Sequence, residues 1–110
     1  MKEIEQAKDI LERKIDHIQT VSDWAEFMNI ESKKYFSRII RNYYGKRPKK
    51  IIVEIKLQKI RNVFTTMDKE IFFAVAKTLG FKSDIALYKF VKRHTGKTLK
   101  ELRKECKKGV

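Results

Sequence analysis

The sequence predicts an all-α chain of about seven helices, and three observations support this fold class. Apolar residues recur at helical spacing along nearly the whole chain, and no useful stretch shows the alternation typical of a strand. Helix-capping residues precede the apolar runs, and glycine or asparagine follows several of them. Residues 25–45 also resemble residues 76–96 position by position, so the helical pattern itself is repeated.

The first two helices are predicted from an apolar stripe and a capping box. The stripe on the first helix is formed by Ile4, Ala7, Leu11, Ile15 and Ile18. Thr20 then offers a side-chain oxygen and Asp23 follows three residues later, which is the capping-box pattern that begins a second helix. Asn29 tolerates the left-handed conformation, so we expect this short helix to end there.

The third and fourth helices are predicted on either side of the first glycine. We expect Ser32 to cap a third helix that runs to about Tyr44 and is stopped by Gly45. Pro48 fits the first turn of a long fourth helix, because the amide hydrogen that proline lacks is unpaired at this position in any case. The apolar residues of this helix fall largely on one side, at Ile52, Ile55, Ile60 and Phe64.

The last three helices are predicted from the same signals. Asp68 is a candidate cap for a fifth helix, which Gly80 stops. Ser83 is expected to cap a sixth helix that ends at Gly96. A second capping box, over residues 98–101, begins a short C-terminal helix.

The internal repeat has an offset of 51 residues and needs no gap. Ala25 matches Ala76 and Asn29 matches Gly80, so each copy places a turn residue four positions after a small residue. The small residue lets two helices cross closely, and the turn requires a positive φ, which glycine and asparagine tolerate best. Two such patterns in one register predict a duplicated helix-turn-helix. Further matches are Met28 with Leu79, Ile30 with Phe81, Ser32 with Ser83, Phe36 with Leu87, Arg38 with Lys89, Ile40 with Val91, Arg41 with Lys92, Gly45 with Gly96 and Lys46 with Lys97.

Charge is distributed unevenly along the chain. The 110 residues include 27 basic and 14 acidic ones, which gives a net charge of +13. Residues 1–31 contain four basic and eight acidic residues, whereas residues 32–110 contain 23 and six. A field of one sign over most of a molecule favours a polyanion as partner. A soluble protein with lysine-rich faces would have the same composition, and this alternative stays open here.

Several classes of protein are excluded by what the sequence lacks. There is no run of about 18 apolar residues and no apolar core of a signal peptide, so we expect a cytoplasmic protein without a membrane span. The lone Cys106 cannot form an internal disulfide, and His17 and His94 lie apart from any cluster of metal ligands. No catalytic constellation and no glycine-rich phosphate loop is present. We therefore expect no enzymatic activity, no cofactor and no metal.

The second copy of the repeat contains two longer motifs. Residues 76–81 read Ala-Lys-Thr-Leu-Gly-Phe, and they look like the A-x-x-x-G-F segment in the signature of AraC/XylS-type transcription regulators. Residues 90–98 look like the F-K-(K/R)-x-x-G-x-(T/S)-P segment, and residues 102–103 look like the closing Y-R. The resemblance covers about residues 20–103, and its first half rests on Tyr35, Phe36, Ser37, Arg38, Gly45, Lys46, Arg47, Pro48, Lys56 and Leu57.

The resemblance implies a fold of two homeodomain-like helix-turn-helix subdomains. They would occupy residues 1–50 and 67–110, joined by a linker helix over residues 51–66. The departures from the signature keep apolar character and should leave this fold intact; they are Leu99 for proline, Val91 for phenylalanine and Leu102 for tyrosine.

The same resemblance implies a way of holding double-stranded DNA. The second helix of each subdomain would lie in the major groove, and the linker helix would hold these two inserted helices roughly 34 Å apart. A single chain could then bind an asymmetric site without dimerising. RNA polymerase is a candidate second partner, although no residue singles out a surface for it.

In the first subdomain the resemblance places Lys34, Ser37 and Arg38 at base-contacting positions. Arg38 is the leading candidate, because a guanidinium can donate two hydrogen bonds to guanine O6 and N7. A solvated basic face is the alternative for all three residues. The candidate phosphate contacts are Lys33, Arg41, Lys46, Arg47 and Lys49.

In the second subdomain the corresponding base-contacting positions are Asp84, Ile85 and Lys89. Asp84 could accept from cytosine N4 and Ile85 could touch a thymine methyl group. An aspartate near phosphates is unfavourable, however, and the isoleucine could pack elsewhere. The second subdomain could therefore contact phosphates more than it recognises bases. The candidate phosphate contacts are Tyr88, Lys92, Arg93 and Lys97.

Other functions compatible with the composition are a protein-interaction module that docks a partner on the first helix and a nonspecific nucleic-acid binder. Double-stranded RNA hides its major groove from helices, and no exposed stacking platform is evident. A basic membrane-surface helix is disfavoured because the bases are spread over a helix-turn-helix pair. The sequence therefore favours a sequence-specific DNA-binding regulator.

Overall fold

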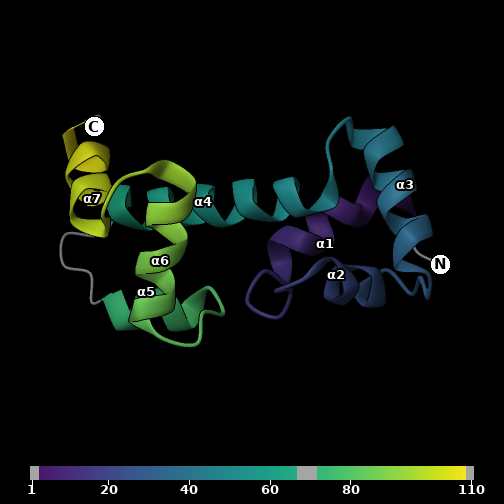
Figure 1. Ribbon diagram of the computed structural model, residues 1–110, viewed down its shortest axis with the longest axis horizontal. Coiled ribbons are helices and arrows are strands. Elements are labelled where there is room, and N and C mark those ends of the chain that lie inside the picture. Colours follow the sequence, from purple (N-terminus) through teal and green to yellow (C-terminus); the bar gives the residue numbers. More distant parts are fainter. Residues whose placement is uncertain (1–2, 67–71, 109–110) are drawn as a thin grey trace. The chain divides into compact units, whose positions relative to one another are not determined.

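The computed structural model describes residues 3–66 and 72–108, which form helices joined by turns (Figure 1). These residues contain no strand, so the predicted all-α class is confirmed. The chain divides into two compact units, Met1–Ile55 and Lys56–Val110. In chain order the elements are the 3-10 helix η1 (Ile4–Gln6) and the α-helices α1 (Ala7–Arg13), α2 (Val21–Phe27), α3 (Lys33–Tyr44), α4 (Pro48–Thr66), α5 (Phe72–Thr78), α6 (Asp84–Thr95) and α7 (Leu99–Lys108).

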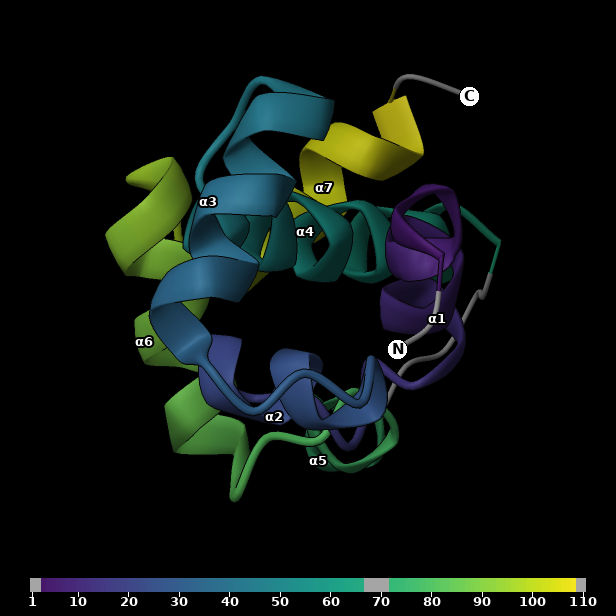
Figure 2. The ribbon, with the colours of Figure 1, turned by 90° about the vertical axis from the view of Figure 1, so that its right-hand side faces the viewer.

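The first unit is built around Trp24, which is fully buried. Its ring meets the Phe36 ring edge to face, with the ring centroids 5.2 Å apart. Its indole Nε1 donates a hydrogen bond to the Ala7 carbonyl at 3.0 Å, which spares a buried donor the cost of being unpaired. Since Ala7, Trp24 and Phe36 belong to α1, α2 and α3, one side chain holds these three helices together (Figure 2).

A second contact joins the beginning of the chain to α3. Tyr44 Oη donates a hydrogen bond to the Ile4 carbonyl at 2.8 Å and accepts one from the Lys8 amide at 3.3 Å. Burial raises the pKa of Tyr44, the hydrogen bond from Lys8 lowers it, and the nearby Tyr43 and Glu5 add to the increase. The fold therefore favours the neutral phenol at this position.

The expected first helix was correct in its buried positions and wrong in its length. The stripe predicted a helix that reaches Ile18, but α1 ends at Arg13. Ile15 and Ile18 are buried nonetheless, in a turn where the Lys14 carbonyl accepts hydrogen bonds from the amides of residues 17 and 18. Contacts in the core determine the backbone conformation of this segment, because the intrinsic preference for a helix is only weak.

The second unit has its core where α6 packs on α5 and α7. Leu87 of α6 and Leu102 of α7 are fully buried. Lys56 of α4 is only 4% exposed. Its Nζ lies 5.0 Å from the centroid of the Phe81 ring and 5.8 Å from that of Phe90. The negative faces of the rings attract the ammonium and so offset part of the cost of burying a charge.

The predicted beginnings of several helices are confirmed. The Asp23 amide donates to Thr20 Oγ1 and the Thr20 amide to Asp23 Oδ2, both at 3.1 Å, which completes the capping box of α2. At α7 the Glu101 amide donates to Thr98 Oγ1 at 3.2 Å. α4 begins at its predicted proline. The predicted cap at Asp68 lies outside the described residues.

Two general findings concern the described part of the chain. No helix in residues 3–66 or 72–108 is long and apolar enough to cross a bilayer. The same residues include no group of three or more His, Cys, Asp and Glu side chains placed to hold a metal ion. Cys106 is a free, partly buried thiol.

Candidate nucleic-acid interface

The turn between the two helices of each helix-turn-helix has the same hydrogen bond in both units. The Ile30 amide donates to the Ala25 carbonyl at 2.9 Å, and the Phe81 amide donates to the Ala76 carbonyl at 2.8 Å. The asparagine and the glycine that precede these donors have φ of 59° and 81°, as predicted. This hydrogen bond satisfies a terminal carbonyl of α2 or α5 and turns the chain into the next helix.

The second helices, α3 and α6, are also bounded in the same way. The side chains of Ser32 and Ser83 each accept a hydrogen bond from the amide three residues later, at 3.1 Å in both units. Gly45 and Gly96 end the helices with φ of 75° and 74°. A Cβ at either glycine would meet nothing within 4 Å, so the left-handed backbone and not lack of space favours glycine.

A groove of about 770 Å³ in the first unit is lined by α3, the beginning of α4 and the first residue of α2. Lys34, Ser37, Arg38 and Arg41 share one face of α3, because residues three and four apart are neighbours on a helix. Among the residues that the structure describes, none with an acidic side chain lines the groove. The lining consists of Val21, Lys34, Ser37, Arg38, Arg41, Asn42, Arg47, Pro48 and Lys49.

A groove of about 910 Å³ in the second unit is lined by α6, the beginning of α7 and the residue before it. Its described lining likewise contains bases and no acid. The residues are Tyr88, Lys89, Lys92, Arg93, Thr98, Leu99 and Lys100.

The two grooves are built from the same positions of the repeat. Every residue that lines the second groove is the 51-residue equivalent of a residue that lines the first. The correspondence also continues past Lys46 and Lys97. The pairs are Ser37 with Tyr88, Arg38 with Lys89, Arg41 with Lys92, Asn42 with Arg93, Arg47 with Thr98, Pro48 with Leu99 and Lys49 with Lys100.

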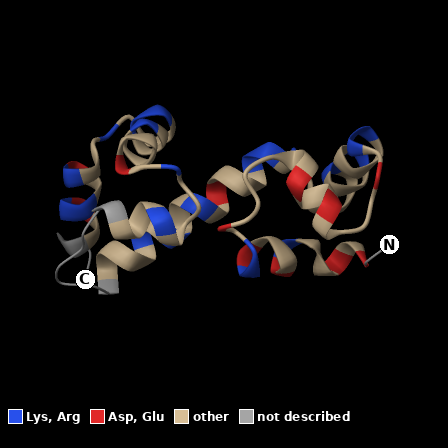
Figure 3. Cartoon of the chain, turned by 90° about the horizontal axis from the view of Figure 1, so that it is seen from below, with Lys and Arg blue, Asp and Glu red and all other residues tan. Residues whose placement is uncertain are grey.

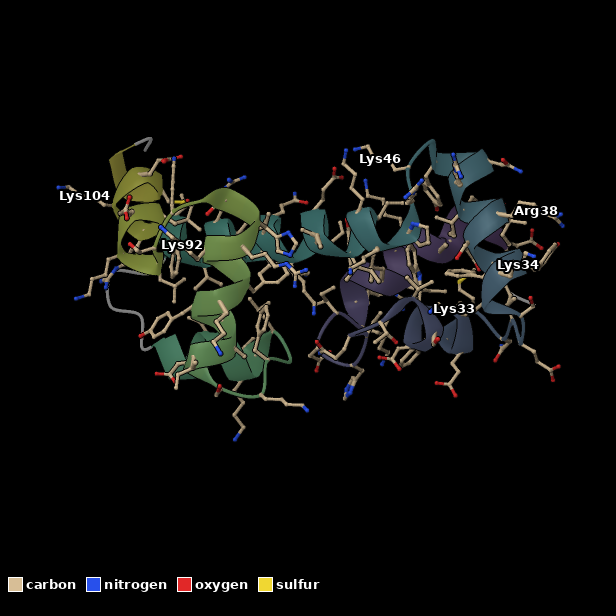
Figure 4. All side chains as sticks on the ribbon, viewed as in Figure 1. Lys33, Lys34, Arg38, Lys46, Lys92 and Lys104 are labelled. Atoms are coloured by element: carbon tan, nitrogen blue, oxygen red, sulfur yellow. The ribbon has the colours of Figure 1, made fainter. Side chains whose placement is uncertain are left out.

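The predicted base-reading residues of α3 come together in the first groove. Lys34 and Arg38 are exposed and project from the outer side of the helix (Figure 4), while Ser37 is half-buried. The Arg38 guanidinium carbon lies 5.5 Å from the centroid of the Tyr35 ring, a contact that restricts the side chain and leaves its N–H donors available. Of the predicted phosphate contacts, Arg41, Arg47 and Lys49 also line this groove, and Lys33 and Lys46 do not.

The predicted contacts of α6 divide differently. Tyr88, Lys89, Lys92 and Arg93 line the second groove, whereas Asp84, Ile85 and Lys97 do not. The Ile85 side chain is exposed, with 58% of its surface accessible. Asp84 Oδ1 accepts a hydrogen bond from the Ile85 amide at 3.0 Å, so the carboxylate is engaged at the beginning of its own helix.

Sequence reasoning missed five groove residues, which are Val21, Asn42, Pro48, Thr98 and Leu99. Asn42 is the repeat equivalent of the predicted Arg93 and Thr98 that of the predicted Arg47, so the offset would have found these two. Pro48 and Leu99 are equivalents of each other, and neither was predicted as a contact. Val21 follows the cap of α2, and no signal in the sequence points to it.

None of the acidic residues that the structure describes lines either groove. In the first unit they gather in the stretch that follows the N-terminus (Figure 3). Lys46 Nζ contacts Glu54 at 3.0 Å and Lys97 Nζ contacts Glu105, so two of the predicted phosphate contacts have carboxylate partners. The grooves therefore carry positive charge without a described carboxylate in their lining, which favours a polyanion as ligand.

Comparisons with known proteins identify the fold. A family model described as a helix-turn-helix domain matches residues 24–105. The chain is similar to a transcriptional regulator with an AraC-type DNA-binding domain from Chromobacterium violaceum, with 21% identity and a TM-score of 0.73 over 94% of this chain and 90% of that one. It is also similar to the DNA-binding domain of AdpA, solved in complex with a target DNA (19% identity, TM-score 0.77, 96% and 93% covered).

A third similar structure is the C-terminal domain of AraT, a response regulator from Geobacillus stearothermophilus (18% identity, TM-score 0.78, 93% and 84% covered). At these identities the likeness establishes a common fold. No curated protein sequence matches the chain.

Proposed function

The chain belongs to the AraC-type family of helix-turn-helix domains, and from this premise we propose that it regulates transcription by binding double-stranded DNA through both of its units. Its family and fold are those of non-enzymatic DNA-binding regulators. The AdpA domain, which has the same fold, was solved with its target DNA. Each unit would place its second helix, α3 or α6, in the major groove.

The observation that carries the proposal is the pair of equivalent basic grooves. A surface with no role in binding has no reason to keep basic residues at equivalent positions of both copies, and three of the seven paired positions do so. These pairs are Arg38 with Lys89, Arg41 with Lys92 and Lys49 with Lys100. Lys49 and Lys100 stand in the first turns of α4 and α7, where backbone amides and a cation can meet the same phosphate.

In the first unit α3 reads base edges. Arg38 donates two hydrogen bonds to guanine O6 and N7, and its contact with Tyr35 reduces the freedom that the side chain loses on binding. Lys34 and Ser37 complete the reading face. The phosphate contacts are Lys33, Arg41, Lys46, Arg47 and Lys49.

In the second unit the reading face of α6 has a different character. Its exposed Ile85 reads a thymine methyl group, and Lys89 donates to a base edge. Asp84, engaged at the start of its helix, accepts from a cytosine amino group only at its remaining oxygen. The phosphate contacts are Tyr88, Lys92, Arg93 and Lys97.

α4 contributes residues to both units, which supports its proposed role as the linker helix between them. With two such helices in one chain, a monomer suffices to bind an asymmetric site. RNA polymerase is a further proposed partner where the bound chain activates transcription.

The test is selection of binding sites from random duplexes, followed by salt titrations of the selected duplex and a scrambled one. We expect one asymmetric sequence to be enriched. Arg38→Ala should cost roughly 1–3 kcal/mol of binding free energy and remove the preference at a single base position.

Arg41→Ala is the matched control, since it removes the same charge from the same face of α3. It should weaken binding to both duplexes equally and reduce the salt slope by about 1. If binding depends steeply on salt but no sequence is enriched, the chain is a nonspecific nucleic-acid binder. If no duplex is bound at low salt, the function belongs to a protein-interaction module instead.

A further inference from the structure

The residue that follows the terminal glycine of each second helix forms an ion pair in both units. Lys46, after Gly45, contacts Glu54 of α4 with Nζ 3.0 and 3.3 Å from the two carboxylate oxygens. Lys97, after Gly96, contacts Glu105 of α7. Figure 4 shows Lys46 on the same side of the first unit as the beginning of α4. Each pair spans eight residues of sequence across the turn that leads from one helix to the next.

The two ion pairs are equivalent in the repeat. Lys46 and Lys97 are 51 residues apart, and so are Glu54 and Glu105. Each glutamate is the seventh residue of its helix, counted from Pro48 in α4 and from Leu99 in α7. Residues 32–110 contain only six acids against 23 bases, and two of the six stand at these equivalent positions.

The two ion pairs contribute little to the folding stability of the chain. The side chains are 50% and 43% exposed in the first pair and 41% and 52% exposed in the second. Ion pairs this open to solvent contribute little to folding, because water screens the attraction and two long side chains lose freedom. Each glutamate also places a negative charge beside a lysine that follows a reading helix and is a proposed phosphate contact outside the two grooves.

We propose that Glu54 and Glu105 limit the affinity of the chain for DNA by competing with phosphate for Lys46 and Lys97. This inference rests on the proposed function. A lysine ammonium is a point charge with three donors, so it exchanges one oxyanion partner for another without a change of fold. Lys46 and Lys97 must therefore leave their glutamate partners before they can contact phosphate. Each glutamate thus makes one phosphate contact less favourable. The effect is the same for every sequence, since phosphate contacts carry no sequence information.

The experiment measures duplex binding of Glu54→Gln, Glu105→Gln and the double variant over a range of salt concentrations. Glutamine keeps the length of the side chain and removes the charge. For each glutamate replaced we expect the salt slope to steepen by about 1 and the affinity to rise up to about eightfold near 0.1 M salt, the counterion-release term for one phosphate. The gain should be equal for the selected and the scrambled duplex.

A double-mutant cycle separates competition from general electrostatics. In the Lys46→Gln background, Glu54→Gln should have no further effect on affinity, because the lysine that it would release is gone. Glu26→Gln, which removes the same charge from an exposed position on α2, should change affinity far less than Glu54→Gln.

Three results would overturn the inference while leaving the proposed function intact. These are unchanged or weaker binding by both glutamine variants, a gain that persists without Lys46, and a gain that Glu26→Gln reproduces. A wild-type chain that binds no duplex at any salt would overturn the proposed function and this inference together.

Discussion

We expect Gly45→Ala to destabilise the first unit and Gly96→Ala to destabilise the second by the same amount. Both glycines have a left-handed backbone, with φ of 75° and 74°. Their amides donate to the carbonyls four residues earlier at 2.9 and 3.0 Å. Since a Cβ at either site would meet nothing within 4 Å, the two substitutions change backbone preference and introduce no clash.

The expected loss follows from two opposing terms. An L-residue in the left-handed region costs roughly 1–2 kcal/mol. Alanine also restricts the unfolded chain, which offsets roughly 0.4–1 kcal/mol of that cost. The net loss should be about 1 kcal/mol at each site. Asparagine visits this region more readily, so Gly45→Asn should lose less than Gly45→Ala.

Urea unfolding measures these losses, and the chain provides a reporter for the first unit. Trp24 is the only tryptophan and is fully buried in that unit, so its fluorescence follows the first unit, while circular dichroism follows helices throughout the chain. Gly45→Ala should move the fluorescence midpoint to lower urea with an unchanged slope. Gly96→Ala is followed by circular dichroism.

Three outcomes would refute the reasoning about the glycines. A higher midpoint with alanine would mean that the helix continues through the site. A loss well above about 3 kcal/mol would mean that the added methyl group meets neighbouring atoms after all. Clearly unequal losses at Gly45 and Gly96 would mean that the two helix ends are not equivalent.

Ser32→Ala and Ser83→Ala should each cost about 1 kcal/mol of folding stability in urea titrations, because each removes a cap, and threonine at either position should lose less; an unchanged midpoint would contradict the capping role. The raised pKa of Tyr44 means that the folded chain holds the phenol proton more tightly than the unfolded chain. Its contribution to stability is therefore complete below the ordinary pKa of 10.0 and is lost as pH rises through the folded pKa. Tyr44→Phe should remove this decline, and an equal decline in both proteins would count against it.

The ends of the helices could be predicted because their signals are local. Ser32 and Gly45 bound α3 through hydrogen bonds within a few residues, and Pro48 begins α4. The length of α1 could not be predicted in this way. The apolar stripe through Ile18 correctly reported burial, but whether Ile15 and Ile18 reach the core from a helix or from a turn depends on residues far along the chain.

The lining residues of the two grooves could be predicted where they occupy equivalent positions of the repeat. The face that Arg38 and Arg41 share follows from helical spacing, and the offset extends to the residues that complete the lining. The ion pair between Lys46 and Glu54 could not be predicted from spacing, because a contact over eight residues across a turn depends on how α4 is rotated after that turn. The recurrence of Glu54 as Glu105 was nevertheless visible in the sequence.

The two copies of the repeat differ where specificity would be decided. Arg41 and Lys92 keep the same charge, as expected for contacts to phosphate, which is the same at every base pair. Among the proposed base-reading positions of α3, by contrast, Lys34 is matched by the exposed Ile85, and Ser37 by Tyr88, which is proposed to contact phosphate instead. Charged donors suit guanine, whereas aliphatic side chains suit the methyl group of thymine. Two units with the same fold and different reading faces are therefore suited to two unlike half-sites, which supports the proposal that a single chain binds an asymmetric site.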